Sequence, residues 1–357
     1  MKAVVYESVG GPEVLKCVSI ADPTPGPGEV RVRVRATSLN RIDWYLRKED
    51  DDAVPMPHIL GADVAGIVEK VGTGVTGWSE GDEVVVWPGM SCGQCRWCQR
   101  GNDSSCESFG ILGYQSQGGY AELTVVPARN LLSKPRRLSF EEAASVPLVF
   151  TTAYHQLVTR GGLHTGDTVL VMGGSSGIGS AAIQISKTAG ARVVTTVGSA
   201  AKVELARQLG ADFVVQHNVS DWPEQIRSVV GAHGVDLVCE HFGGDYLRSC
   251  IGLLAPLGRL VTIGYTVDSQ LQIDLSDILS KQLSLSTSYV GSRSELAEVL
   301  KLMEWGAIRP VVARVFPLEE ARAAHELFDS RDYFGKIVLS VAAEQMNTPS
   351  PSSVRER

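Results

Sequence analysis

The 357-residue sequence has few aromatic residues, no strong excess of either charge and no long apolar run. Its 33 basic and 40 acidic residues give a formal net charge of -7, which argues against a nucleic-acid or anionic-membrane partner. A membrane span would need ~20 consecutive apolar residues, and no segment approaches that length. The opening segment, Met1–Tyr6, alternates like a strand and lacks an apolar signal-peptide region, so we expect a cytoplasmic protein.

Cysteine is also scarce, but its distribution is uneven. Four of the seven cysteines fall in one Gly-rich stretch with the pattern Cys-x2-Cys-x2-Cys-x7-Cys: Cys92, Cys95, Cys98 and Cys106. In a reducing compartment such clustering favours a metal over disulfides, with free or redox-sensing thiols as the alternative. Four thiolates close a tetrahedral zinc and leave no open coordination position, so we predict a structural zinc. The other three, which have apolar neighbours, are expected to be buried thiols: Cys17, Cys239 and Cys250.

The residue pattern changes part-way along the chain. Short valine-rich runs with strict alternation, such as Gly28–Arg35, predict half-buried strands and a β-rich, barrel-like first domain. Alternating strands and helices follow, and they imply a parallel sheet with helices on both faces, an α/β arrangement. The predicted division is 1–125 for the first domain with a zinc lobe at 88–112, 126–150 for a connecting segment, 151–290 for the nucleotide domain, 291–342 for a return to the first domain, and 343–357 for a disordered tail.

A glycine-rich turn predicts the nucleotide site. The strand Thr168–Met172 runs into Gly-Gly-Ser-Ser-Gly-Ile-Gly and then into an Ala-rich helix, the context that a dinucleotide fingerprint requires. Glycines let the backbone approach a pyrophosphate, and the new helix favours its negative charge. A tight turn without a ligand is the plainer alternative; a nucleophile elbow also fits, but no clear acid and histidine pair follows. The predicted contacts are Gly174, Ser175, Ser176, Gly177, Ile178 and Gly179.

The segment after the second strand of this domain predicts which cofactor binds. NAD sites usually place an acid about 20 residues after the fingerprint, where it accepts hydrogen bonds from the ribose. Here Val197–Lys202 contains no acid. Gly198 leaves room for a 2'-phosphate, Ser199 can donate a hydrogen bond and Lys202 supplies positive charge, so NADP(H) is predicted. The alternative is that Lys202 is only a solvated residue in the first turn of a helix.

Together these motifs resemble the medium-chain dehydrogenase/reductase superfamily from Met1 to Val341. The resemblance also rests on several further blocks: Leu60–Gly72, Gly81–Val84, Gly118–Glu122 and Thr152–Tyr154. It implies a GroES-like β-barrel catalytic domain, a Rossmann domain with a doubly wound parallel sheet, an active site between them and a homodimer. The cysteine-rich lobe is similar to that of the zinc-containing alcohol dehydrogenases in this superfamily.

At the expected active site the chain departs from the zinc-dependent members. They carry a cysteine where this chain has Asn40, Gly-His-Glu where it has Gly61–Asp63, and a third ligand close to Leu148. Alanine and leucine cannot bind zinc. The residues Asn40, Asp43 and Tyr45 resemble instead the quinone oxidoreductase branch, which usually has no zinc lobe. His58, near the lost site, is expected to make a local hydrogen bond rather than bind a metal.

These departures predict a reductase that works without a catalytic metal. Reducing a simple carbonyl would create an alkoxide that only hydrogen bonds could stabilise, whereas a conjugated carbonyl or a quinone spreads the charge. We therefore expect hydride to pass from NADPH to an enone, enal or quinone, with Asn40 and Tyr45 near the carbonyl oxygen and Tyr45 or solvent supplying the proton. Asp43 is a third candidate. The plainer roles are loop fixation by Asn40, capping of a helix at Trp44 by Asp43 and packing by Tyr45.

The resemblance also implies further cofactor contacts: Thr152, Phe242, Gly243, Ile263, Gly264, Tyr289, Gly291 and Lys336. Two other functions stay open at this point. One is an alcohol dehydrogenase that recruits a catalytic zinc through non-standard ligands such as His58 and Asp63. The other is a cofactor-binding protein without turnover.

Overall fold

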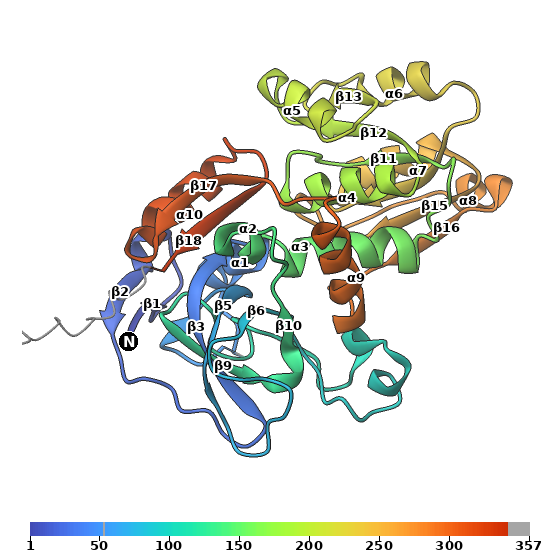
Figure 1. Ribbon diagram of the computed structural model, residues 1–357. Helices are drawn as coiled ribbons and strands as arrows, with labels where there is room; N and C mark the ends of the chain where they lie inside the picture. The colour runs from blue at the N-terminus through green and yellow to red at the C-terminus, as the bar shows by residue number, and fades with distance from the viewer. Residues whose placement is uncertain (53, 342–357) are drawn as a thin grey trace, which may run out of the picture.

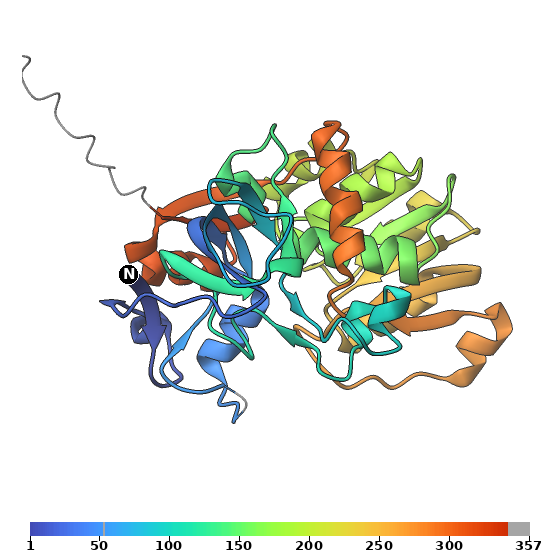
Figure 2. The ribbon, with the colours of Figure 1, turned by 60° about the horizontal axis from the view of Figure 1, so that its bottom comes forward.

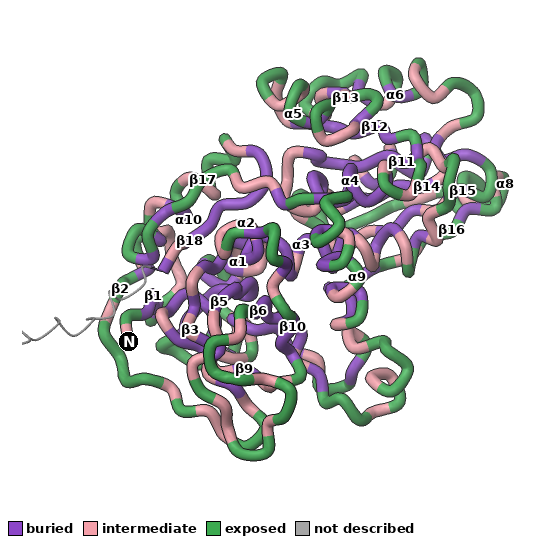
Figure 3. Tube along the Cα trace, in the orientation of Figure 1, coloured by how far each residue is buried: buried purple, intermediate pink, exposed green. Residues whose placement is uncertain are grey.

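The computed structural model describes residues 1–52 and 54–341, so the tail predicted at 343–357 lies outside the described residues. Two lobes lie side by side, one rich in strands and one with strands and helices in alternation (Figure 1). No helix in the described ranges is long and apolar enough to cross a membrane. The burial pattern shows a buried interior in each lobe (Figure 3).

The first lobe is a β-barrel-like body built around a seven-stranded sheet in the order β10-β6-β5-β3-β18-β17, with β9 pairing β3. Its valines alternate along β3, where Val30, Val32 and Val34 are buried while the intervening arginines are partly exposed. A second sheet has the order β2-β1-β4. The strands of this lobe are β1 (Lys2–Tyr6), β2 (Lys16–Ser19), β3 (Glu29–Ser38), β4 (His58–Ile59), β5 (Asp63–Val71), β6 (Glu83–Val86), β7 (Gly89–Met90), β8 (Gly110–Ile111), β9 (Leu123–Pro127), β10 (Leu131–Ser133), β17 (Val312–Pro317) and β18 (Lys336–Ser340).

The second lobe is a six-stranded parallel sheet in the order β13-β12-β11-β14-β15-β16. One apolar cluster includes residues of α4 and α9 and another includes residues of α6 and α7, so helices cover both faces. This doubly wound arrangement confirms the predicted fold class. Its elements are β11 (Thr168–Val171), α4 (Gly177–Thr188), β12 (Arg192–Val197), α5 (Val203–Gln208), β13 (Phe213–Gln216), α6 (Trp222–Val230), β14 (Val235–Glu240), α7 (Gly244–Leu253), β15 (Leu254–Thr262), α8 (Leu275–Lys281) and β16 (Ser284–Thr287).

The chain crosses between the lobes more than once. Strand pairing of the first lobe runs past residue 125, because β9 ends at Pro127 and β10 pairs with β6. Helices α2 (Phe140–Ala144) and α3 (Pro147–Tyr154) then lead into the second lobe. After α9 (Arg293–Glu304), which stands between the lobes in Figure 2, the chain returns through β17, α10 (Ala321–Ser330) and β18. The predicted domain limits stay predictions.

The cysteines outside the zinc lobe divide into two groups. Cys239 and Cys250 are buried in the second lobe, as expected from their apolar neighbours. Cys17 is exposed, so the expectation of a buried thiol was wrong there. It lies on β2, which in the described ranges pairs only with β1 and whose residues are mostly exposed.

Candidate active site and cysteine cluster

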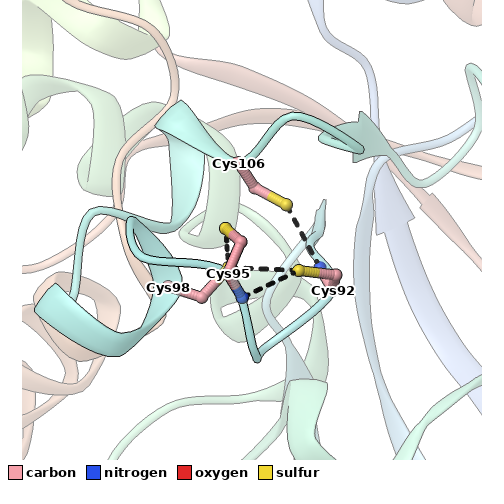
Figure 4. A group of neighbouring side chains, drawn as sticks. All are labelled: Cys92, Cys95, Cys98 and Cys106. Atoms are coloured by element: carbon pink, nitrogen blue, oxygen red, sulfur yellow. Dashed lines mark hydrogen bonds between the residues drawn. The ribbon is translucent and has the colours of Figure 1, made fainter.

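The four cysteines of the predicted zinc lobe come together between β7 and β8 (Figure 4). Their sulfur atoms all lie within 4.8 Å of one another, with Cys92 Sγ 3.9 Å and Cys95 Sγ 3.5 Å from Cys98 Sγ. Four zinc–sulfur bonds of about 2.3 Å in a tetrahedron place the sulfurs about 3.8 Å apart, so this donor set fits a closed zinc site. The Cys92 N–H also donates to Cys106 Sγ, as expected for a cradle that holds thiolates.

The segment on either side of Cys106 contacts the second lobe. Asp103 accepts a hydrogen bond from the backbone N–H of Arg293, where α9 begins, at 3.3 Å, and another from Ser91 Oγ at 3.4 Å. Phe109 packs edge-on against Tyr289 of the second lobe, with ring centroids 5.8 Å apart. The cysteine lobe therefore contacts the second lobe through Asp103 and Phe109.

A second polar cluster forms where β3 ends and its neighbours β5 and β18 begin. The register places Ser38 of β3 opposite Asp63 of β5, and Val338 of β18 opposite Ser38. Lys336 begins β18, and Asn40 follows β3 at the start of α1 (Arg41–Lys48). Strand pairing thus brings Ser38, Asn40, Asp63 and Lys336 together. We call these four residues the junction network, because they lie at the boundary with the second lobe.

The carboxylate of Asp63 is the centre of the junction network. Its Oδ2 accepts hydrogen bonds from Ser38 Oγ at 2.7 Å, from Asn40 Nδ2 at 2.8 Å and from Lys336 Nζ at 3.1 Å. Its Oδ1 accepts one from the backbone N–H of Leu148 in α3, at 2.7 Å. Lys336 Nζ also donates to Asn40 Oδ1 at 2.5 Å and to the carbonyl of Leu39 at 2.6 Å. Every polar atom of the buried ion pair is therefore engaged.

Asp43 forms a second buried carboxylate beside the network. It accepts hydrogen bonds from the backbone N–H of Asn40 at 2.7 Å and of Gly61 at 3.0 Å. Burial raises the pKa of Asp43 to about 7, and the Asn40 and Gly61 N–H groups oppose that rise. The helix begins at Arg41, not at the Trp44 expected from the sequence, so Asp43 sits in its first turn and reaches back to the residue that caps it.

The junction network does not fit a catalytic metal. Ala62 and Leu148 offer no donor atom, and the ammonium of Lys336 already binds the oxygens of Asn40 and Asp63. His58 is buried and its Nε2 lies 3.1 Å from the carbonyl of Gly113, which is the local contact expected of it. Across the described ranges, the cysteine cluster is the one gathering of three or more potential His, Cys, Asp or Glu ligands at metal-binding distance.

The glycine-rich turn, residues 173–179, has the geometry of a close backbone approach. Gly173 has φ +65°, and a Cβ on Gly179 would come within 2.2 Å of the Gly173 carbonyl. Ser176 caps α4 by accepting a hydrogen bond from the Gly179 N–H at 2.9 Å. The turn thus begins a twelve-residue helix whose first N–H groups face the carboxyl end of β11, where a pyrophosphate is bound in such sheets.

Comparison with known proteins agrees with both lobes. Residues 26–136 match the alcohol dehydrogenase GroES-like domain, and residues 177–305 match the zinc-binding dehydrogenase family. A quinone oxidoreductase of Sus scrofa is 31% identical over 95% of this chain and 97% of its own length. An NAD-dependent alcohol dehydrogenase of Saccharolobus solfataricus is 30% identical over 95% of this chain and 99% of its own.

The chain belongs to the medium-chain dehydrogenase/reductase superfamily.

Solved structures agree with this assignment. A crystal structure of an NAD-dependent alcohol dehydrogenase superposes with a TM-score of 0.92 at 44% identity, covering 96% of this chain and 100% of the other. A crotonyl-CoA carboxylase/reductase in complex with NADP superposes with a TM-score of 0.88 at 27% identity, covering 95% and 94%. The superfamily thus supplies a GroES-like domain and a Rossmann domain, while its members named here differ in substrate and cofactor.

Within this superfamily fold, Tyr45 is the predicted catalytic residue with an available hydroxyl. It is partly exposed on α1, packs edge-on against Trp44 with ring centroids 5.2 Å apart, and has no hydrogen-bond partner for its hydroxyl in the described part of the chain. Burial raises the pKa of Tyr45, and the charge of Arg41 opposes that rise. The side-chain amide of Asn40, in contrast, is already hydrogen-bonded to Lys336, Asp63 and Ser38, and Asn40 is only 4% exposed.

The residues predicted to bind the 2'-phosphate lie at the carboxyl end of β12, but the Lys202 side chain contacts the first lobe instead. Its Nζ donates to the carbonyl of Arg331 in the first lobe at 2.7 Å. His217 was not predicted, although it directly follows β13 and so falls at the same edge of the parallel sheet. Its Nε2 lies 3.6 Å from where a Cβ on Gly198 would be, and burial lowers the pKa of His217 to about 4.

The remaining predicted cofactor residues fall at the lobe junction or at the ends of Rossmann strands. Thr152 donates its hydroxyl to the carbonyl of Leu148 at 2.7 Å. The backbone N–H groups of Phe242 and Gly243 both donate to Glu240. Other members of the set lie after β15, after β16 and in β18: Ile263, Gly264, Tyr289, Gly291 and Lys336. Their contacts with a cofactor stay predictions.

Proposed function

We propose that the protein is an NADPH-dependent reductase of conjugated carbonyls or quinones, with a structural zinc and no catalytic metal. The observation that carries the proposal is the junction network. Lys336 binds the two residues, Asn40 and Asp63, that retain donor atoms at the lost metal site, and Ala62 and Leu148 offer none. The site therefore has a fixed ammonium where a Lewis acid would have to bind, and it favours substrates that delocalise their own charge.

The chemistry proposed for Tyr45 follows from its position and protonation. NADPH, when bound, supplies a hydride, which would be accepted at the far carbon of an enone or at a quinone. The reduced substrate then needs a proton on the resulting enolate or phenolate. Because the raised pKa keeps its hydroxyl protonated at neutral pH, Tyr45 can donate a hydrogen bond to the carbonyl oxygen and deliver that proton, or solvent can. Asn40 and Asp43 then fix the start of α1, a revision of the direct role expected for Asn40.

The preference for NADP(H) rests on residues at the end of β12. No carboxylate follows this strand, and Ser199 and Lys202 can turn toward a 2'-phosphate, with His217 beside Gly198. The two alcohol dehydrogenases compared above are named NAD-dependent, whereas the carboxylase/reductase structure holds NADP. Similarity to this last protein and to the quinone oxidoreductase supports conjugated substrates, since crotonyl-CoA is itself a conjugated thioester.

The proposal includes one zinc held by the four cysteines, a homodimer and a cytoplasmic location. Support for the homodimer comes from β16, which among the residues that the structure describes pairs only with β15 and so leaves one strand edge open. Apolar side chains are exposed on β16 and on the neighbouring helix α8, among them Leu275, Leu279 and Leu285. Light scattering on purified protein tests the assembly directly, and Leu279→Glu should shift it toward the monomer.

The test of the proposed function is a substrate panel combined with a metal count. Enones, enals and quinones with NADPH should be turned over, and saturated ketones and alcohols should not. A second bound metal together with alcohol oxidation would favour the rival zinc-dependent alcohol dehydrogenase. Tight NADPH binding without oxidation of the NADPH by any compound of the panel would favour a binding protein instead.

A further inference from the structure

One side chain connects the glycine-rich turn with the junction network. The backbone N–H of Gly335 donates to the Ser175 carbonyl inside the turn at 2.9 Å. The next residue, Lys336, passes over Gly177, where an added Cβ would lie 2.7 Å from Lys336 Cδ. Its Nζ then ends on Asn40 and Asp63 in the first lobe. Lys336 therefore spans the distance from the turn of the Rossmann lobe to the strand ends of the barrel lobe.

Both ends of this connection are fixed. The ammonium has three donors, and these are taken by Leu39, Asn40 and Asp63. Lys336 is 4% exposed and Asp63 is fully buried, so withdrawal of the lysine would leave a buried carboxylate without its counter-charge. At the other end Gly177 has no side chain, and this lets the lysine stem lie directly on the backbone of the turn. A change in the position of one lobe would therefore displace Lys336 and alter its contacts with the other lobe.

We propose that Lys336 is a positioning residue that couples the dinucleotide turn to the junction network, so that cofactor binding and the order of the network stabilise each other. The coupling is reciprocal, because a network that holds the turn in its binding geometry is itself held by a bound cofactor. The proposal rests on the proposed function only in taking a nicotinamide dinucleotide as the ligand of the turn. It does not depend on which substrate is reduced.

A double-mutant cycle on cofactor affinity tests this coupling. Wild type, Asp63→Asn, Lys336→Met and the double variant are titrated with NADPH and with NADH, following the fluorescence of the nicotinamide in the absence of any substrate. Each single substitution should weaken binding of the preferred dinucleotide by about tenfold. The double variant should bind it with no lower affinity than the single variant that binds it less tightly. Lys134→Met is the matched control, because this mostly buried lysine of the same lobe pairs with Glu83 away from the turn and should leave affinity unchanged.

The cycle separates coupling through the network from independent effects of the two residues. Wild-type affinity in Asp63→Asn would overturn the proposal even if Lys336→Met failed to fold. Additive losses in the double variant would overturn it as well. Because no substrate is present, a failure of the proposed reductase activity would not affect the outcome.

Discussion

The cysteine lobe and the junction network both bring ionisable side chains close together, but they differ in the group that can balance their charge. In the lobe, four sulfurs lie within 4.8 Å of one another, a donor set that fits a tetrahedral zinc ion. In the junction network, the chain supplies its own cation, and Lys336 meets Asp63 at 3.1 Å. The donor set of the lobe thus fits a metal ion, whereas in the network an amino group of the chain itself lies beside the carboxylate.

The largest effect that tests this contrast is the loss of metal from the lobe. Cys106→Ser should reduce the bound zinc from about one ion per chain to nearly none, because a closed tetrahedral site needs all of its thiolates. Cys17→Ser, an exposed cysteine on β2, should retain the metal. Atomic emission on dialysed protein measures both. Equal zinc in the two variants would show that the metal is held elsewhere.

The next effect concerns the stability of the junction network. Lys336→Met should lower the free energy of unfolding by about 3 to 5 kcal/mol, because it leaves Asp63 buried without its counter-charge. In the double variant with Asp63→Asn no charge is left unpaired, and most of this loss should be recovered. Denaturant unfolding measures each protein. A double variant as unstable as Lys336→Met would mean that the ion pair is not what holds this region.

A smaller effect is expected at Tyr45. Tyr45→Phe should lower kcat for an enone about tenfold, less than the usual contribution of a general acid, because solvent can deliver the proton in its place. The affinity for NADPH should stay unchanged. Tyr154→Phe serves as a control, since burial raises the pKa of that tyrosine in the same way but it lies on α3. An unchanged kcat would assign Tyr45 to packing.

The mildest test uses the pH dependence of stability. Burial lowers the pKa of His217 and of His241 to about 4, from the 6.5 of an exposed histidine. Between pH 4 and pH 6.5 the unfolded state therefore binds more protons than the folded state, and the free energy of unfolding rises with pH. Asp43 acts oppositely, because its pKa rises from 3.8 to about 7 on folding and stability then falls with pH. Asp43→Asn should therefore give a steeper rise in thermal stability from pH 4.5 to 6.5. A shallower rise would contradict the pKa assigned to Asp43.

Local patterns sufficed to predict the lobes and the cysteine cluster. The alternation along β3, the strand–turn–helix around Gly177 and the closely spaced cysteines are each formed within a few residues, so their chemistry can be deduced from sequence. The missing metal ligands were likewise visible at Ala62 and Leu148 once the family resemblance was recognised.

The junction network could not be predicted in this way. Its members come from three strands, and Lys336 meets Asn40 only because β18 pairs with β3 after nearly the whole chain has been traversed. The same holds for Lys202, whose contact with the Arg331 carbonyl depends on how the two lobes pack. His217 was closer to prediction, since it directly follows β13 at the edge of the parallel sheet where the fingerprint also lies. Tertiary packing, not local pattern, determines which groups these lysines contact.

The most direct test of the metal-free site is a metal count on active wild-type protein, combined with turnover in the presence of a strong chelator. The account predicts a single zinc ion per chain, its loss in Cys106→Ser, and enone or quinone reduction that the chelator does not slow while the cysteine-bound ion is retained. A second ion whose removal abolishes turnover would contradict it.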